Sequence, residues 1–197
     1  MRPALSTRIQ ALMESLGRPA LIAIDGPAGS GKSTLAEALR QSFPDSLLIH
    51  ADDFFLQPHQ RTQERLVEPG GNLDRERLLN QVLLPIKLGS YTGHQRYNCH
   101  TGQMEQVPGV IRPLIIIEGS YSHHPDLRSH YDLTVFLDID SGTQLQRLRA
   151  RCAEEGILKR FTDTWIPMEN AYFERFKVRY QADVLFPCPS SNLGGKP

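Results

Sequence analysis

Residues 21–34 join a short apolar run to a glycine-rich turn and then to a segment with helical periodicity. The apolar run, Leu21–Ile24, is aliphatic and bounded, as expected for a strand buried on both faces, and the apolar positions after Lys32 recur at helical spacing. Glycines let the backbone of the turn bend so that successive N–H groups converge on one point. The sequence therefore predicts a buried strand, a tight turn that can cradle an anion, and a helix whose positive end faces that turn.

The turn matches the pattern Gly-x-x-x-x-Gly-Lys-[Ser/Thr] between Gly26 and Ser33. In a loop of this kind, Lys32 would reach the β- and γ-phosphates of a nucleoside triphosphate, and the hydroxyl of Ser33 would bind Mg²⁺. We therefore predict a nucleoside triphosphate and Mg²⁺ as ligands. The predicted nucleotide-binding residues are Gly26, Ala28, Gly29, Ser30, Gly31, Lys32, Ser33 and Thr34.

The chain carries 22 basic and 22 acidic side chains, so its formal charge is zero. This balance provides no broad attraction to nucleic acid or to an anionic membrane, and a local site must recognise the partner instead. No apolar run approaches the roughly 20 residues that cross a bilayer, and Cys99, Cys152 and Cys188 lack metal-ligand spacing. We expect a cytoplasmic protein with reduced thiols that acts on a small molecule. The sequence leaves its oligomeric state open, a homo-oligomer included.

Apolar runs alternate with segments of helical periodicity along the chain. Further strands are predicted at 46–51, 113–119, 133–138 and 183–186, and helices within 1–17 and at 74–84, 141–155 and 164–181. Residues 90–107 have the pattern of a β-hairpin, the polar residues 56–72 that of a surface loop, and residues 187–197 that of a flexible tail. Strands separated by helices over 197 residues predict one α/β domain: a three-layer P-loop NTPase fold with a parallel sheet flanked by helices and an inserted hairpin.

Local signals predict where some of these helices end and which way their side chains face. Pro85 is expected to end the helix that precedes it, and Ser141 is expected to cap the helix that follows it. Trp165 and Phe173 lie on one stripe of the helix at 164–181, so we expect both in the core.

Two of the predicted strands bring carboxylates that we expect at the site, at the edge where open α/β sheets keep their sites. The strand at 113–119 carries Glu118 at its end, which fits a Walker B acid that shares Mg²⁺ with Ser33. The strand at 46–51 leads into Asp52 and Asp53. Only one of these two can face an acceptor, because successive side chains of a strand point to opposite faces, and the pattern leaves open which one does.

The phosphate loop alone does not define the reaction. GTPases need a guanine-reading N/T-K-x-D tetrapeptide, which this sequence lacks, and motor or transport ATPases rarely fit so small a chain. A small-molecule kinase needs a carboxylate that takes the proton of the acceptor hydroxyl, and cations that cover the transferred charge. Arg147 and Arg151 share one helix face, and Lys159 and Arg160 fall in a following loop that could close as a lid. For each of these four cations, a solvated basic surface is an equal alternative.

Several further motifs resemble the uridine kinase and phosphoribulokinase branch of the P-loop kinases, over about residues 20–187. They are Asp52-Asp53-Phe54-Phe55 for D-x-F-[YF], Asn72-Leu73-Asp74 for N-[FW]-D, the hairpin stretch Arg96 to His100, the pair Arg147 and Arg151 at the lid, and the late segments 171–176 and 181–184. The resemblance implies an ATP- and Mg²⁺-dependent kinase with Asp52 as general base and the two arginines on the transferred charge. It also implies acceptor contacts by Asp53, Asp74, Tyr97 and His100.

The chain departs from the family pattern in the hairpin and the lid. Arg96 and Asn98 replace the proline and aspartate of the family, and residues 156–160 differ. These are acceptor and lid positions, so phosphoryl transfer is better supported than uridine itself. The 5′-hydroxyl of uridine or cytidine is the leading acceptor, with pantothenate, glycerate or a sugar phosphate as alternatives. Tyr97 and His100 can equally be packing residues of the hairpin. An alternative hypothesis from another functional class is a nucleotide-binding regulator without fast turnover.

Overall fold

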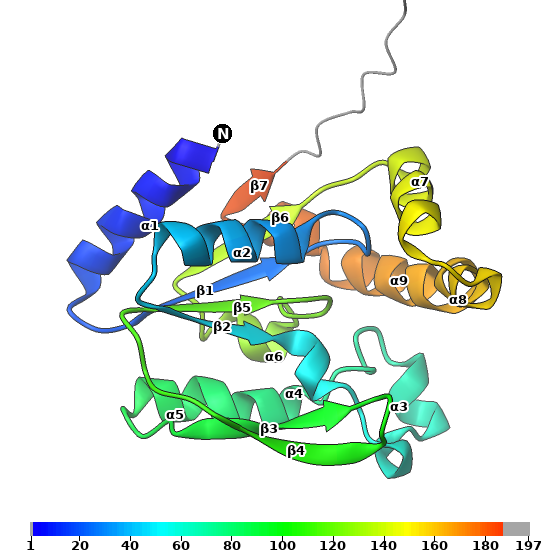
Figure 1. The fold of residues 1–197 in the computed structure, drawn as a ribbon, viewed down its shortest axis with the longest axis horizontal. Coiled ribbons are helices and arrows are strands. Elements are labelled where there is room, and N and C mark those ends of the chain that lie inside the picture. The colour runs from blue at the N-terminus through cyan, green and yellow to red at the C-terminus, as the bar shows by residue number, and fades with distance from the viewer. Residues whose placement is uncertain (1, 187–197) are drawn as a thin grey trace, which may run out of the picture.

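The structure, a computed structural model, describes residues 2–186. Over these residues, five strands form one parallel sheet in the order β2-β5-β1-β6-β7, with helices on both faces (Figure 1). The strands are β1 (Ala20–Asp25), β2 (Ser46–His50), β5 (Leu114–Glu118), β6 (Leu133–Leu137) and β7 (Val184–Phe186). This architecture confirms the predicted three-layer α/β fold.

The central strands supply side chains to two apolar clusters, one on each face of the sheet. In β5, Ile115 and Ile117 belong to one cluster, whereas Leu114 and Ile116 belong to the other. All residues of β1 and β5 are buried. Because both faces of the sheet are covered, these strands need apolar side chains on both sides, which explains their nearly continuous apolar sequence.

One face of the sheet is covered by α1 (Arg2–Leu16) and α2 (Lys32–Ser42). Leu5 and Ile9 of α1 and Leu35 and Leu39 of α2 are buried in the same cluster. The helix predicted within residues 1–17 is therefore confirmed. Its apolar stripe packs beside the first strand.

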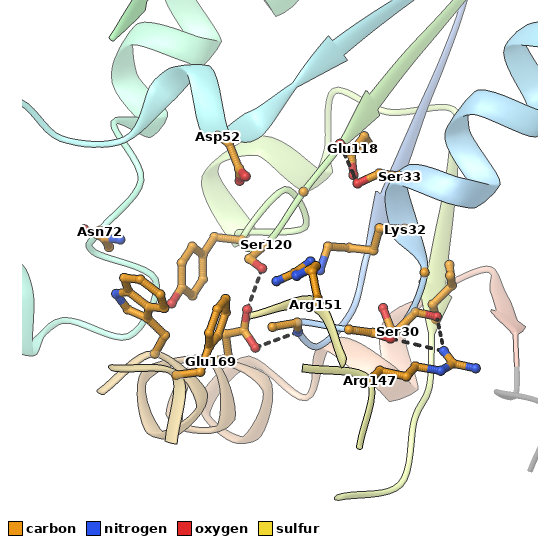
Figure 2. Close-up of a pocket in the computed structure, with 18 of the residues that line it drawn as sticks. Ser30, Lys32, Ser33, Asp52, Asn72, Glu118, Ser120, Arg147, Arg151 and Glu169 are labelled. Carbon is orange, nitrogen blue, oxygen red and sulfur yellow. Dashed lines mark hydrogen bonds between the residues drawn. The ribbon is translucent and has the colours of Figure 1, made fainter. Parts of the chain in front are cut away.

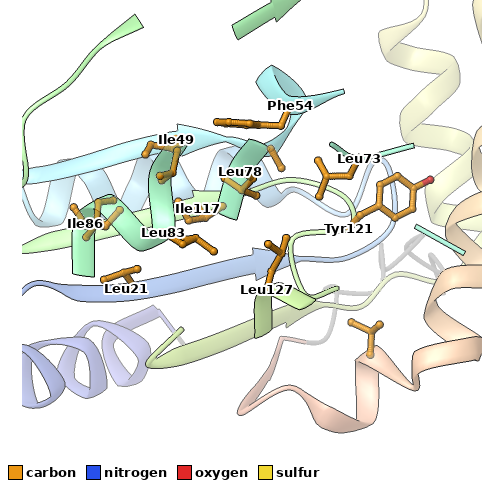
Figure 3. Close-up of a cluster of buried hydrophobic side chains, with 14 of the residues drawn as sticks. Leu21, Ile49, Phe54, Leu73, Leu78, Leu83, Ile86, Ile117, Tyr121 and Leu127 are labelled. Carbon is orange, nitrogen blue, oxygen red and sulfur yellow. The ribbon is translucent and has the colours of Figure 1, made fainter. Parts of the chain in front are cut away.

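The opposite face is covered by a helical segment made of α4 (Arg75–Leu78), η3 (Leu79–Leu83) and α5 (Leu84–Lys87), together with α6 (Pro125–Arg128), α9 (Ile166–Phe176) and α10 (Val178–Gln181). Leu78 and Leu83 pack in one cluster with Ile49 of β2 and Ile117 of β5 (Figure 3). This cluster joins the sheet to the segments that carry the acidic strand ends.

The prediction that the helix ends before Pro85 was wrong. The helical segment continues to Lys87, with a π-helical turn over Leu79–Leu83 directly ahead of the proline. Pro85 has no N–H to donate, and in a regular α-helix its ring would press on the carbonyl of residue 81. The wider turn accommodates the missing hydrogen bond, so the helix passes through the proline.

The predicted bounds of the next helix were also wrong. The N-cap of α7 (Ser141–Arg151) is Asp140, whose side chain accepts the N–H of Thr143 at 2.8 Å. A carboxylate accepts such a bond more strongly than a hydroxyl, which explains why Asp140 rather than Ser141 caps the helix. A separate helix, α8 (Glu155–Arg160), follows. Lys159 and Arg160 therefore lie on a helix instead of in a loop.

The helix predicted at 164–181 has two interruptions. A π-helical turn, η4 (Phe161–Trp165), joins α8 to α9. Lys177 has a φ of 49° and separates α9 from α10. A left-handed residue cannot continue an α-helix, so the amphipathic stripe is divided between two helices.

The inserted hairpin is confirmed as β3 (Gly93–Asn98) paired antiparallel with β4 (Gln103–Pro108). The loop predicted at 56–72 contains two short helices, η2 (Pro58–Gln60) and α3 (Gln63–Val67). Arg65 anchors this segment, because its guanidinium donates to the carbonyls of Gly71 and Leu73 and to Glu76. The segment is therefore held by specific bonds rather than being an irregular loop.

Two expectations fall outside the described residues, the tail at 187–197 and the thiol of Cys188. Among residues 2–186, no helix is both long and apolar enough to cross a bilayer.

Candidate active site

The glycine-rich turn connects the carboxyl end of β1 to the first residue of α2, as predicted. Gly26 has a φ of 145°, and a Cβ at this position would lie 2.3 Å from the carbonyl oxygen of Leu137. Any other residue would therefore push the loop away from β6. The turn thus keeps its shape through a close backbone contact that only glycine permits.

The interior of the turn contains two polar side chains that could contact a bound anion, Ser30 and Lys32. The hydroxyl of Ser30 is buried and has no hydrogen-bond partner among the described residues. The ammonium of Lys32 donates to the carbonyls of Gly26 and Pro27, at 2.6 and 3.2 Å. An unpartnered donor and a flexible cation beside a helix N-terminus fit a phosphate group.

The loop forms one wall of a cleft of about 1250 Å³. Figure 2 shows Lys32, Asp52 and Glu118 around the same opening, although they come from three separate segments. Of the predicted nucleotide-binding residues, the structure brings all but Gly26 to the cleft wall. Gly26 does not line the cleft; it lies against the backbone of Leu137 and fixes the shape of the loop there.

Glu118 lies against the N-terminus of α2. Both of its carboxylate oxygens accept from the hydroxyl of Ser33, each at 3.3 Å, and one also lies 2.6 Å from Nδ1 of His50. The hydrogen bond to Glu118 raises the pKa of His50. Within residues 2–186, no group of three or more acidic, histidine or cysteine side chains could hold a metal by itself. A hydroxyl and one carboxylate fit Mg²⁺, which keeps several waters and binds substrate phosphates.

The structure separates Asp52 from Asp53, which follow β2 in a single 3₁₀ turn, η1 (Ala51–Phe54). Asp52 lines the cleft, whereas Asp53 lies 3.3 Å from Nε2 of the buried His94 on the hairpin. The protein packed around the Asp52 carboxylate and the negative charge of Glu118 raise the pKa of Asp52, although the residue is exposed to the opening of the cleft. Geometry and electrostatics therefore favour Asp52 as the group that could take a proton.

Three residues implied as acceptor contacts do not line the cleft. Asp53 faces the hairpin, and Asp74 is buried, where it caps α4 and pairs with Arg77 at 3.1 Å. His100 is exposed at the turn between β3 and β4. Tyr97 of the same hairpin does reach the cleft, and it is the one residue of β3 (Gly93–Asn98) that lines it.

The two arginines of α7 both reach the cleft, as their spacing predicts. Arg147 donates to the carbonyls of Gly29 and Ser30, at 3.1 and 3.4 Å (Figure 2). Arg151 lies over the ring of Phe161, 5.3 Å from its centroid. Arg160 also lines the cleft, whereas Lys159 does not.

Sequence reasoning missed two polar residues that contact the phosphate loop. Glu169 of α9 accepts the Ala28 N–H at 2.9 Å and the hydroxyl of Ser120 at 2.6 Å, as Figure 2 shows. Gln144 of α7 donates to the carbonyl of Ala28 at 3.0 Å. Each lies more than 100 residues from the loop along the chain, so no local pattern joins them. A polar side chain on the buried stripe of a predicted helix is the one signal that could have marked them.

Aromatic side chains also line the cleft. The expectation that Trp165 is a core residue was wrong: its ring lies at the cleft, 4.6 Å from that of Phe161. Phe173 does pack against the core. The remaining aromatic residues that line the cleft are Phe55, Tyr97, Tyr121 and Phe186. Tyr121 has a φ of 71°, a strained conformation for a bulky side chain that occurs most often at functional sites.

Arg77 was also missed, although it fixes the acidic turn to the hairpin. Its buried guanidinium donates to the carbonyls of Asp53 and Phe55, at 3.1 and 3.2 Å, and to the carbonyl of Gln95 in β3. It also pairs with Asp74. One side chain therefore sets the position of the turn that carries Asp52 relative to the strand that carries Tyr97.

Comparison with known proteins identifies the family. The family model described as phosphoribulokinase / uridine kinase matches residues 21–156. The chain belongs to this family. It is 29% identical over 200 residues to a uridine kinase of Lactobacillus helveticus (strain DPC 4571), which covers 92% of each sequence.

Solved structures agree on the fold of this family member. A possible uridine kinase from Bacillus stearothermophilus has a TM-score of 0.65 at 23% identity, over 93% of this chain and 99% of that one. D-glycerate 3-kinase from Cryptococcus neoformans var. grubii has a TM-score of 0.55 at 15% identity, over 87% and 89%. Their names give different acceptors for one fold, so the fold does not identify the acceptor.

Membership of the family confirms the predicted resemblance. The protein is an ATP-dependent small-molecule kinase of the P-loop class, a class whose members in general use ATP with Mg²⁺. This activity argues against the alternative of a nucleotide-binding regulator without fast turnover. The acceptor and the role of each site residue remain to be assigned.

Proposed function

We propose that the protein transfers the γ-phosphoryl group of ATP to the 5′-hydroxyl of a pyrimidine nucleoside, uridine or cytidine. The observation that carries this proposal is the composition of the cleft. Asp52 faces the same opening as Lys32 and Glu118, and aromatic side chains, Tyr97 and Trp165 among them, line the same cleft. Aromatic side chains suit a planar base, which stacks on them at little cost in orientation.

In this mechanism the loop amides and Lys32 bind the triphosphate. Ser33 and Glu118 would hold Mg²⁺, which offsets the charge of the phosphates when it is bound. Asp52 accepts the proton of the acceptor hydroxyl, because it faces the cleft and its raised pKa makes it a better base than an ordinary aspartate. Arg151 supplies positive charge from the opposite wall.

A second acceptor class is favoured by Arg61. This residue lines the cleft, and its Nε donates to the carbonyl of Leu56 at 3.0 Å. No carboxylate pairs with Arg61 among residues 2–186, whereas the nearby Arg65 is occupied by Glu76 at 2.7 Å. A free guanidinium at the acceptor side suits a carboxylate or phosphate on the acceptor, as in glycerate, pantothenate or a sugar phosphate.

An ADP-release screen tests the proposal and separates these classes. The panel contains uridine, cytidine, purine nucleosides, pantothenate, glycerate and sugar phosphates, each with ATP and Mg²⁺. We expect ATP turnover that is negligible alone and is stimulated by a pyrimidine nucleoside, with 5′-phosphorylation verified by mass. Stimulation by an anionic acceptor alone would reject the nucleoside and support the second class.

A further inference from the structure

The peptide groups on both sides of Ala28 are held from outside the phosphate loop. The N–H of Ala28 donates to Glu169 of α9, and the carbonyl of Ala28 accepts from Gln144 of α7. Both side chains are buried, with 4% and 7% exposure. These two bonds fix the orientation of two consecutive peptide planes, since each plane is rigid.

An acid at position 169 is costly to the fold. Burial raises the pKa of Glu169, and the nearby Lys32 ammonium opposes that rise. A carboxylate is tolerated in such a place only when its oxygens are bonded, and here each oxygen has one donor, from Ala28 and from Ser120. An apolar side chain would pack α9 equally well. The bond to the loop is therefore what this acid adds.

We propose that Glu169 and Gln144 are positioning residues that set the conformation of the phosphate loop for a nucleoside triphosphate. They hold the peptide planes that lead into Gly29 and Ser30, so the amides that follow keep fixed directions before the ligand arrives. Loss of either bond leaves a half-buried polar group of Ala28 without its protein partner and lets these planes rotate. The inference rests on the proposed function only for the identity of the ligand, ATP.

The test is a calorimetric titration of a non-hydrolysable ATP analogue with Mg²⁺ into the full chain, without acceptor. Glu169→Ala should bind the analogue about 10-fold more weakly, by the usual cost of an unpaired buried group. Removing a negative charge would by itself tighten binding of a triphosphate, so weaker binding cannot come from charge. Glu169→Gln should stay within about 3-fold of the unaltered chain, because its amide can still accept from Ala28 and donate to Ser120.

Gln144→Leu provides an independent arm, because it removes a neutral donor at similar volume and should also weaken binding about 10-fold. The matched controls are Glu174→Ala on α9 and Gln146→Leu on α7, both exposed in the structure and expected to bind as the unaltered chain does. Melting temperatures verify that each variant is folded.

Folded Glu169→Ala or Gln144→Leu that binds as tightly as the unaltered chain would overturn the inference. Glu169→Gln that is as weak as Glu169→Ala would overturn it as well, because Gln keeps an acceptor for the Ala28 N–H, and the bond to Ala28 would then not account for the loss. The titration contains no acceptor, so failure of the nucleoside proposal leaves this result interpretable. An unaltered chain that binds no analogue would overturn both proposals.

Discussion

The two halves of the cleft are built in different ways. The nucleotide half consists mostly of one continuous turn, residues 26–34, whose shape depends on glycine and on the start of α2. The acceptor half is assembled from separate segments that contribute Asp52, Arg61, Tyr97 and Trp165. A continuous turn can be recognised from its sequence, whereas an assembled wall depends on the packing of distant parts. This difference explains why the triphosphate is evident and the acceptor is not.

The largest expected effect comes from a substitution of Asp52, the group proposed to connect the acceptor half of the cleft with the nucleotide half by accepting a proton. Asp52→Asn should lower kcat about 10²–10⁴-fold, the usual worth of a general base, while ATP still binds. Asp53→Asn is the matched control, because Asp53 faces His94 instead of the cleft, and we expect at most a few-fold loss. Steady-state kinetics with the acceptor found in the screen measure both. Normal turnover by Asp52→Asn with loss in Asp53→Asn would reverse the assignment.

The second prediction concerns how the acceptor half is held together. Arg77→Met keeps the aliphatic stem but removes donors from three carbonyls and leaves Asp74 buried without its cation. We expect a loss of about 3–5 kcal/mol in the free energy of unfolding, measured with urea. Arg96→Met removes an exposed pair with Glu105, which solvent screens, and should leave the urea midpoint almost unchanged. Equal losses would show that Arg77 does not anchor the hairpin.

The third prediction separates two residues of the same hairpin. Tyr97→Leu removes a ring from the cleft wall and should raise the KM of a nucleoside acceptor about 10-fold, since stacking is worth about 1–3 kcal/mol per base. The affinity for ATP should not change. His100→Ala should leave both parameters within about 2-fold, because His100 does not line the cleft. An acceptor KM that responds to His100 and ignores Tyr97 would contradict this geometry.

The smallest effect is a displacement of the pH profile. The pKa of Asp52 is raised by the protein packed around its carboxylate and by the charge of Glu118. A base must be deprotonated to act, so kcat/KM should fall as the pH drops through this raised pKa. The acid limb should therefore lie above the ordinary aspartate value of about 4. Asp53→Asn should retain the same limb, and a profile that stays flat down to pH 4 would contradict the assignment.

Local sequence patterns predicted most of the fold. Apolar runs gave all five strands of the sheet in residues 2–186, because a strand covered on both faces must be apolar throughout. Helix ends were less predictable. Pro85 lies inside a helix because the preceding π-helical turn relieves it, and the cap of α7 is Asp140 because a carboxylate competes with the hydroxyl beside it. The residue at which a helix begins or ends depends on small differences in free energy between alternative local conformations.

The same local patterns predicted part of the candidate site. Lys32, Ser33 and Glu118 lie at strand ends or in one turn, and parallel strands bring those ends to one edge of the sheet. Asp74 and His100 matched a motif by their spacing, yet Asp74 is buried as a helix cap and His100 is exposed. A short motif gives the order of residues along the chain, and it does not give the direction of their side chains.

The sequence by itself determined the phosphate loop, the acidic strand ends and the apolar strands, because each of these depends on residues that are close together along the chain. Only the tertiary structure decided that Asp52 rather than Asp53 faces the cleft, and that Glu169 and Gln144 hold Ala28. These contacts join residues more than 100 positions apart or depend on how one turn rotates. These contacts form, and stabilise the site, only once the helices have packed on the sheet.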